Sequence, residues 1–405
     1  MKKFGMIALF SALLIAFALP AFAYTVEGAK GERFTMGAEI GYDIGYMGTD
    51  KDYNTYIDAT HGLKEDRTQF FSVLSLNSFL YGSFVVGDVS ATWVLATASW
   101  TQSSNLQASG GPLGNQKDND LIDQLYATYK FGNSYILAGK IGSTWTTYQG
   151  PSFLGYTGGT GSHIYNIALG SVYDNKYPQI RFGQTINKMF SYYIALVTPG
   201  TYEAGAGNTT LSYAQIPAIA AKFTLNFGNF ILHPGMVYQQ VKWDKLPAGW
   251  DDTMTAYHFA LPMRMAFGPF VGIIQLGYGQ NTGGPSSSVS MTSESSYHGF
   301  QRAATGKIYN STCMNGLVDL AFTFGPVTPH IYYAQTRAKN SDAWKAGNDY
   351  YDRISYGLVL HYKINKNLDL IPELSFYDYG TIPNSDSKPK LGKAWLGGVE
   401  FRFLF

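Results

Sequence analysis

The chain of 405 residues carries 29 Lys and Arg against 28 Asp and Glu, a formal net charge of +1. This balance gives no reason to expect nucleic acid as a partner. The single cysteine, Cys313, excludes an intramolecular disulfide and every cysteine-based metal motif, and we expect no cofactor or metal. The 31 Tyr, 26 Phe and 45 Gly occur in a chain of mean hydropathy −0.09. Abundant aromatic residues without long apolar runs indicate alternation rather than membrane-spanning helices.

The first residues have the organisation of a cleaved export signal. Lys2 and Lys3 precede an apolar run over 4–19, and Ala21-Phe22-Ala23 forms a small-x-small cleavage site. The apolar run is shorter than the ~20 residues of a membrane-spanning helix. We therefore expect residues 1–23 to be removed and the mature chain, 24–405, to begin at Tyr24; a retained N-terminal anchor is the alternative.

Apolar residues alternate with polar or small ones at period two in many segments. The clearest are 34–46, 217–227, 257–267 and 354–362. One face of each segment is apolar, and the other carries more charge than the inner face of a soluble β-sandwich. This pattern predicts an all-β fold, a transmembrane antiparallel barrel with one face toward lipid and the other toward water.

Short turns alternate with long polar stretches along the chain. Gly132-Asn133, Gly228-Asn229 and Gly268-Pro269 supply the backbone freedom of tight hairpins, and a Phe precedes each of them. We expect those Phe side chains at the membrane boundary and the short turns on the periplasmic side. The long polar stretches are 48–66, 103–119, 144–178, 200–215, 244–253, 281–312, 339–350 and 380–392.

Between these marks the pattern predicts about sixteen strands, an even number as a closed antiparallel barrel requires. Fourteen and eighteen are the alternatives, because alternation is blurred in 67–102 and either face of 229–243 could point outward. The predicted strands are 34–47, 67–86, 89–102, 120–131, 135–143, 179–187, 189–199, 216–227, 229–243, 254–267, 270–280, 313–324, 327–338, 351–363, 368–379 and 393–405.

The last predicted strand is the most specific local signal. Trp395, Phe401, Phe403 and Phe405 lie on one face of it. This strand resembles the terminal strand of Gram-negative outer-membrane proteins, whose final aromatic residue the barrel-assembly machinery recognises. The resemblance implies that Phe405 is an assembly signal and that this machinery is a partner; an ordinary edge strand is the alternative.

The longest polar stretch, 144–178, follows the fifth predicted strand. Its segment Pro151-Ser152-Phe153-Leu154-Gly155 is similar to the Pro-Glu-Phe-Gly-Gly motif in the third loop of the general porins, with Ser152 in place of the acid. The resemblance implies that this long third loop folds into the lumen as a constriction, with Pro151, Phe153 and Tyr156 against the wall. It further implies a homotrimer in outer-membrane lipids and lipopolysaccharide that passes ions and small hydrophilic solutes.

Charged residues on the predicted inner faces are the candidates for setting selectivity. The predicted lumen-facing bases are Lys140, Arg181, Lys222, Arg264, Arg353, His361, Lys363 and Arg402. The predicted lumen-facing acids are Glu39, Asp43, Asp319, Glu373 and Glu400. Stretch 144–178 contains Asp174 as its only acid, so we expect weak selectivity with a slight preference for anions, dominated by Arg181 and Arg264. Solvated or cross-strand paired charges without such a role are the alternative.

Three other functions remain open. Catalysis is not expected, because the seven His (His61, His163, His233, His258, His298, His330 and His361) lie in no triad or metal motif. A sleeve around a partner protein, such as an electron-transfer cytochrome, requires that 144–178 fold outward. A more substrate-specific solute channel requires aromatic residues in the lumen, and the candidates are Tyr126, Tyr148, Tyr156, Tyr165 and Tyr193.

Overall fold

The computed structural model describes most of the chain from Tyr24 onward. The described residues are 24–29, 31–57, 65–75, 78–96, 122–142, 144–148, 150–151, 173–174, 176–198, 212–282, 288–289, 301–302, 305–340, 350–381 and 390–405. The predicted signal, 1–23, therefore lies outside the described residues. No helix among the described residues is long and apolar enough to cross a bilayer.

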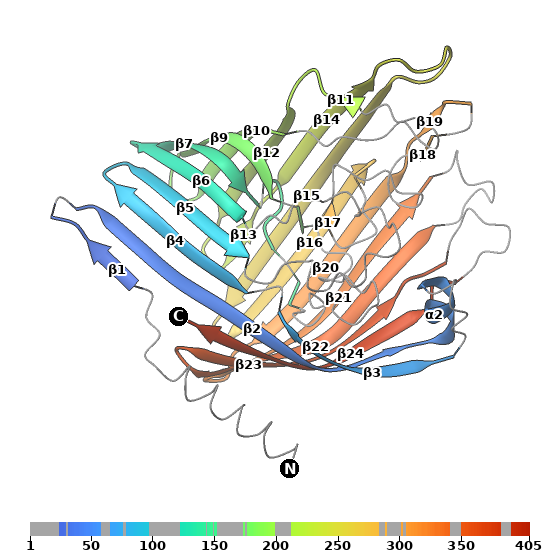
Figure 1. Ribbon diagram of the computed structural model, residues 1–405. Helices are drawn as coiled ribbons and strands as arrows, with labels where there is room; N and C mark the ends of the chain where they lie inside the picture. The colour runs from blue at the N-terminus through green and yellow to red at the C-terminus, as the bar shows by residue number, and fades with distance from the viewer. Residues whose placement is uncertain are drawn as a thin grey trace.

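The strands close into one antiparallel barrel with sixteen wall positions, which confirms the predicted fold class and strand number (Figure 1). The wall consists, in order, of β2 (Arg33–Thr49), β3 (Arg67–Leu74) with β4 (Phe79–Val86), β5 (Val89–Ala96), β6 (Ile122–Phe131), β7 (Ser134–Ile141), β9 (Tyr177–Thr185), β10 (Phe190–Val197), β12 (Ala218–Asn226), β13 (Phe230–Leu232) with β14 (Gly235–Trp243), β15 (Thr253–Phe267), β16 (Phe270–Gln280), β20 (Thr312–Phe322), β21 (Val327–Lys339), β22 (Tyr351–Asn365), β23 (Leu368–Asp378) and β24 (Lys393–Leu404). The barrel closes where β2 pairs with β24, from Glu39 opposite Leu404 to Thr49 opposite Ala394.

Two wall positions are interrupted, and both lie where the alternation was hardest to interpret. β3 and β4 form one position because both pair with β2, with Ser75 and Ser78 at the break between them. β13 and β14 form another because both pair with β12 and β15. The β3–β4 break adds two residues relative to β2 and the β13–β14 break adds none relative to β12 and β15, so the same alternating positions face inward on both sides of each break.

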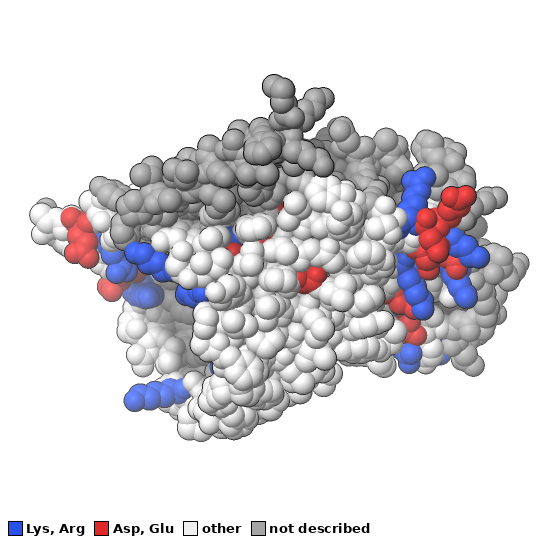
Figure 2. Space-filling view, turned by 90° about the horizontal axis from the view of Figure 1, so that it is seen from below, with Lys and Arg blue, Asp and Glu red and all other residues white. Residues whose placement is uncertain are grey.

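The outer surface of the barrel is apolar. On β22, Tyr356 and Leu358 are 49% and 57% exposed, whereas their neighbours Ser355 and Val359 are buried on the inner face. In the view from below, Figure 2 shows a broad band with few charged residues between groups of charges at the two ends of the barrel. Such a band is the surface that a transmembrane barrel presents to hydrocarbon.

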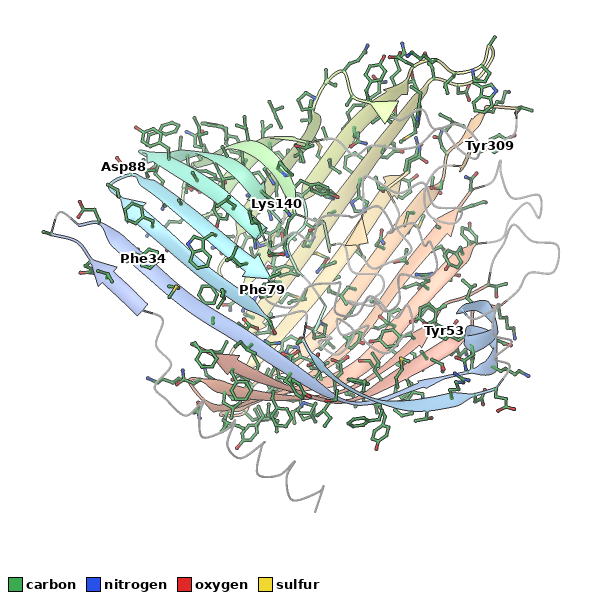
Figure 3. The ribbon with its side chains drawn as sticks, viewed as in Figure 1. Phe34, Tyr53, Phe79, Asp88, Lys140 and Tyr309 are labelled. Atoms are coloured by element: carbon green, nitrogen blue, oxygen red, sulfur yellow. The ribbon has the colours of Figure 1, made fainter. Side chains whose placement is uncertain are left out.

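The short turns gather at one end of the barrel and the long connections at the other. Figure 3 places Asp88, in the turn between β4 and β5, at one end, and Tyr53 and Tyr309, in long connections, toward the opposite end. Gly132 and Gly268 adopt φ of +56° in their hairpins, as the turn prediction required.

The two described chain ends meet along β2. β1 (Tyr24–Glu27) pairs with residues 33–36 of β2, and the Phe405 N–H donates to the Ala38 carbonyl at 2.8 Å. β1 thus continues the line of β24 along the same edge of β2. The terminal strand is paired to its last residue, and the aromatic face that contains Phe401 and Phe403 follows the outward-facing row of β2.

Candidate functional site

The candidate site is the lumen, where two charged walls face one another. The bases Arg181, Lys222 and Arg264 lie on β9, β12 and β15. Four of the five predicted acids (Glu39, Asp43, Glu373 and Glu400) lie on β2, β23 and β24, where Arg402 accompanies them, and the fifth, Asp319, lies on β20. β2 and β24 stand on the far side of the strand order from β12 and β14, as the lower and upper walls in Figure 1 show. One side of the inner surface is therefore basic, and the other carries most of the predicted acids.

On the basic wall, the three bases interact with other protein groups. The Arg181 guanidinium donates to Gln179 Oε1 at 3.0 Å and lies 4.0 Å above the ring of Tyr193. Lys222 Nζ donates to the Thr146 carbonyl at 2.7 Å. Arg264 is only half-buried and is close enough to Tyr148 to act on it electrostatically. Of the three bases, Arg264 is thus the one most open to the lumen.

Residues Thr144–Tyr148, which we call the strap, run along the inside of this wall. The Tyr193 hydroxyl donates to the Thr144 carbonyl at 3.0 Å, and Gln275 Nε2 donates to the Tyr148 carbonyl at 2.5 Å. These donors come from the inner faces of β10 and β16, so the strap lies inside the barrel. The third long connection therefore starts in the lumen, and whether the rest of it forms the predicted constriction concerns residues outside the described ones. Pro151 is buried, whereas Phe153 and Tyr156 lie outside the described residues.

Trp145 anchors the strap in a hollow of the wall, which we call the Trp145 socket. Its ring is fully buried and stacks on Tyr177, with centroids 6.0 Å apart. The socket is made of small and apolar inner-face residues of β9, β10, β12, β14 and β15: Tyr177, Ala195, Val197, Ala218, Ala220, Val237 and Ala260. A wall that is apolar on both faces is stable only where protein covers its inner side.

On the acidic wall, one guanidinium holds two carboxylates. Arg402 Nε lies 3.1 Å from Glu39 Oε1, and its Nη2 lies 2.6 Å from Glu400 Oε1. Ser75, at the β3–β4 break, donates to the second Glu400 oxygen at 3.1 Å. Asp43 stands opposite Glu400 in the strand register and is fully buried, and neither of its carboxylate oxygens has a hydrogen-bond partner among the described residues.

Two further predicted inner charges, Arg353 and Glu373, lie on β22 and β23, on the same side of the barrel as Arg402. Arg353 Nε donates to the Tyr351 hydroxyl at 2.6 Å, and its guanidinium stacks on Tyr351 and Tyr379. Glu373 accepts a 2.5 Å hydrogen bond from the Ser375 hydroxyl.

A small cluster of Asp and His also faces inward. His330 Nδ1 lies 3.0 Å from Asp319 Oδ1, and the rings of His330 and His361 are 5.0 Å apart. Within the described ranges, no group of three or more His, Cys, Asp or Glu could hold a metal ion.

Lys140 was assigned to the wrong face. It stands near the end of β7, opposite Leu125 and Pro178 in the register, and both of these residues are exposed on the outer surface. Its Nζ donates to the Ile122 carbonyl at 3.0 Å. Near a strand end, a long basic side chain can place its charge at the boundary while its stem lies on the apolar surface, so charge alone does not indicate the lumen there.

Sequence reasoning also missed several residues that build the site. The acids of the acidic wall were predicted to face the lumen, and the single acid of stretch 144–178 describes only that loop. The Trp145 socket and Gln179, which donates to Thr144 Oγ1 at 2.9 Å, were not identified. One signal was available, because four inward positions of β10 and β12 are Ala or Val, where a wet lumen favours polar residues: Ala195, Val197, Ala218 and Ala220.

A second segment packs against the inner wall near the long-loop end. α2 (Lys51–Ile57) brings Tyr53 against Leu391, Ala394 and Leu396, inside β24 and its preceding connection. A Cβ atom on Gly392, whose φ is +83°, would lie 2.1 Å from the Tyr53 nitrogen, so the helix sits directly on this backbone. The strap and α2 thus cover two different parts of the inner wall.

No family model matches the chain, and no curated protein matches its sequence. Solved structures do match. OmpT of Vibrio cholerae aligns with 94% of this chain and 100% of its own at 10% identity and a TM-score of 0.53. OprB of Pseudomonas putida aligns with 93% and 94% at 11% identity and a TM-score of 0.51. OmpF of Salmonella typhi, in complex with daunomycin, aligns with 94% and 100% at 11% identity and a TM-score of 0.50.

These likenesses define the class of the fold. The chain is a sixteen-stranded antiparallel barrel of the kind found in outer-membrane proteins. At such low identity, any conclusion about function must rest on the residues of the lumen.

Proposed function

We propose that this chain is a passive diffusion channel for ions and small hydrophilic solutes across the outer membrane of a Gram-negative bacterium. The observation that carries the proposal is the pair of charged inner walls inside a barrel with an apolar outer surface. Charged groups that face a lumen require water around them, and a water-filled lumen is a path for polar solutes.

The strap supports a pore that is narrowed from within. Five residues of the third long connection already lie against the inner wall, and the proposal places the following residues, including Phe153 and Tyr156, at the constriction. Such a segment also argues against a sleeve around a partner protein, because the strap and α2 both occupy the inner wall that a partner would contact.

The proposed selectivity is weak. Arg402 is paired with Glu39 and Glu400, and Lys222 is bound to the strap backbone, so few charges are left to act alone on a passing ion. Arg264 is the most open base of its wall, and we propose that it favours anions slightly.

Planar-bilayer recordings across a salt gradient test both parts of this proposal. Purified protein should form open channels, and Arg264→Ala should shift the reversal potential toward cation preference more than Arg181→Ala does. Lys188→Ala, in the exposed turn between β9 and β10, is the matched control and should shift it least. No conductance from folded protein would rule out the channel, whereas unchanged reversal potentials in both arginine variants would rule out only the proposed selectivity.

A more specific solute channel is the second candidate. The ring of Tyr193 is covered by Arg181 and its hydroxyl is bound to the strap, so it is not free to stack on a sugar. Tyr126 is half-buried, and Tyr156 and Tyr165 lie outside the described residues. Liposome-swelling rates that follow solute size alone support general diffusion, while one solute that enters much faster than its size class supports specificity.

We do not propose catalysis, although Asp319 and His330 are in contact. An Asp–His pair inside a barrel invites a direct test, since hydrolysis of peptide or ester substrates that is lost in His330→Ala would establish an enzyme. The proposal predicts no such hydrolysis and normal conductance for this variant.

The proposal also includes the assembly and environment of the barrel. One of the matching structures is described as a trimer form of OmpT, and we propose a homotrimer for this chain, in contact with outer-membrane lipid and lipopolysaccharide. Gel migration without boiling should show an oligomer that dissociates on heating. Phe405→Ala should reduce the amount of assembled barrel in cells if the assembly machinery reads this residue.

A further inference from the structure

The contact between the strap and its wall has the properties of a packed protein core inside an otherwise polar lumen. Trp145 is fully buried, and Ala195, Ala218 and Ala220 beneath it are each 1% exposed or less. Larger side chains at these positions would occupy the space of the indole ring. The small side chains make a hollow whose shape suits one large ring.

Gly235 shows how closely the strap approaches the wall. A Cβ atom on Gly235 would lie 2.0 Å from the carbonyl oxygen of Trp145 and 2.8 Å from its carbonyl carbon. Both are backbone atoms, which cannot rotate away as a flexible side chain can. The strap backbone therefore rests directly on the backbone of β14, and only glycine allows this.

Polar contacts hold the strap on both sides of Trp145. Thr144 receives hydrogen bonds from Gln179 and Tyr193, and Thr146 receives one from Lys222. These donors lie on β9, β10 and β12, so three strands hold the backbone in register while the ring fills the hollow. Two of the predicted selectivity residues are engaged here, because Arg181 braces Gln179 and Tyr193 while Lys222 binds the strap.

We propose that Trp145, docked in its socket, is the positioning residue that sets the size limit of the pore. This inference rests on the proposed channel function. The ring keeps the start of the third connection against the β9–β15 wall, and the path left for solutes depends on that docking. The charged residues around Trp145 affect the size limit of the pore only through the position of the strap.

Cysteine accessibility tests the docking without relying on conduction. In a Cys313→Ser background, Ala195→Cys places a thiol beneath Trp145. Ser191→Cys places one on the same inner face of β10, four residues away and half-buried. A charged, membrane-impermeant thiol reagent should modify Ser191→Cys quickly and Ala195→Cys slowly. Adding Trp145→Ala should accelerate only the Ala195→Cys reaction, on the order of 100-fold, because loss of a buried indole opens the socket.

The size limit is measured on the same proteins. Liposome swelling with neutral sugars of increasing size should show that Trp145→Ala admits larger sugars than the parent, and Trp145→Phe should restore much of the original cut-off. Gly235→Val provides a second route, because its side chain displaces the strap while the indole is kept. Heat-dependent gel migration confirms that each variant is folded.

Each outcome decides one of the two claims. Equal reactivity of Ala195→Cys and Ser191→Cys in the parent, or an unchanged cut-off once Trp145→Ala has opened the socket, overturns the inference. A folded parent that admits no sugar and conducts no ions overturns the proposed channel function instead, whatever the thiol reactivities show.

Discussion

The wall from β9 to β15, which contacts the strap, and the wall from β22 through β24 to β2, which carries the carboxylates, are both built from strands with alternating residues. Their inner faces nevertheless differ. The inner residues of the first wall are small and apolar beneath the strap, and Lys222 holds the strap through the Thr146 carbonyl. The second keeps its carboxylates on the inner face and balances them with Arg402. The composition of each inner face therefore depends on what covers it. Residues beneath the strap can be apolar, whereas residues that face water or form ion pairs remain polar.

The largest effect is expected on the acidic wall. Arg402→Met should destabilise the barrel by about 3–5 kcal/mol, because it leaves Glu39 and Glu400 without their shared cation. The measurement is the temperature at which the folded band on gels is lost. Combining Arg402→Met with Glu400→Gln should recover part of the stability; if the single substitution is silent, the wall is not held by this ion pair.

The stability of the wall beneath the strap should depend on side-chain volume rather than on charge. Gly235→Val should cost about 1–3 kcal/mol, since its side chain overlaps the Trp145 backbone. The control is Gly316→Ala, where the nearest atom to an added Cβ is 3.9 Å away and little change is expected. Equal unfolding temperatures for the two variants would contradict the close contact between the strap and β14.

Substitution of Asp43 is expected to raise the stability of the barrel rather than lower it. Asp43→Asn should stabilise the barrel by about 1–2 kcal/mol, because it replaces a buried carboxyl group that faces Glu400 with an amide whose N–H can donate to Glu400. Glu39→Gln, which weakens the ion pair with Arg402, should instead lower the unfolding temperature. A loss of stability in Asp43→Asn would mean that another group compensates this carboxylate.

The smallest effect is expected at the rim, where charges meet water. Arg337 pairs with Asp352 at 2.7 Å, but the two side chains are 45% and 31% exposed. Arg337→Ala should therefore change stability by less than about 1 kcal/mol and leave conductance unaltered. A loss of stability as large as that expected for Arg402→Met would contradict the predicted difference between the exposed ion pair at the rim and the ion pair of the inner wall.

Much of the candidate site could be predicted, with errors that have identifiable causes. Arg181, Lys222, Arg264 and Arg402 all lie on inner faces, because they occupy the polar positions of clearly alternating strands. Lys140 fails because it is near a strand end, where polar residues occur on both faces. Trp145 could not be placed, since it follows the last residue of β7 and no periodicity extends into the loop.

The sequence by itself determined the barrel, because a period of two with one apolar face and short glycine turns leaves few other ways to satisfy every backbone group in a membrane. It also determined which side chains face the lumen along regular strands. Only the tertiary structure decided that most inner acids stand across the lumen from Arg181, Lys222 and Arg264, since that depends on which strands meet when the ring closes. The docking of the strap was likewise decided there, because a buried ring and a glycine far apart in the chain become partners only when the barrel brings them within contact.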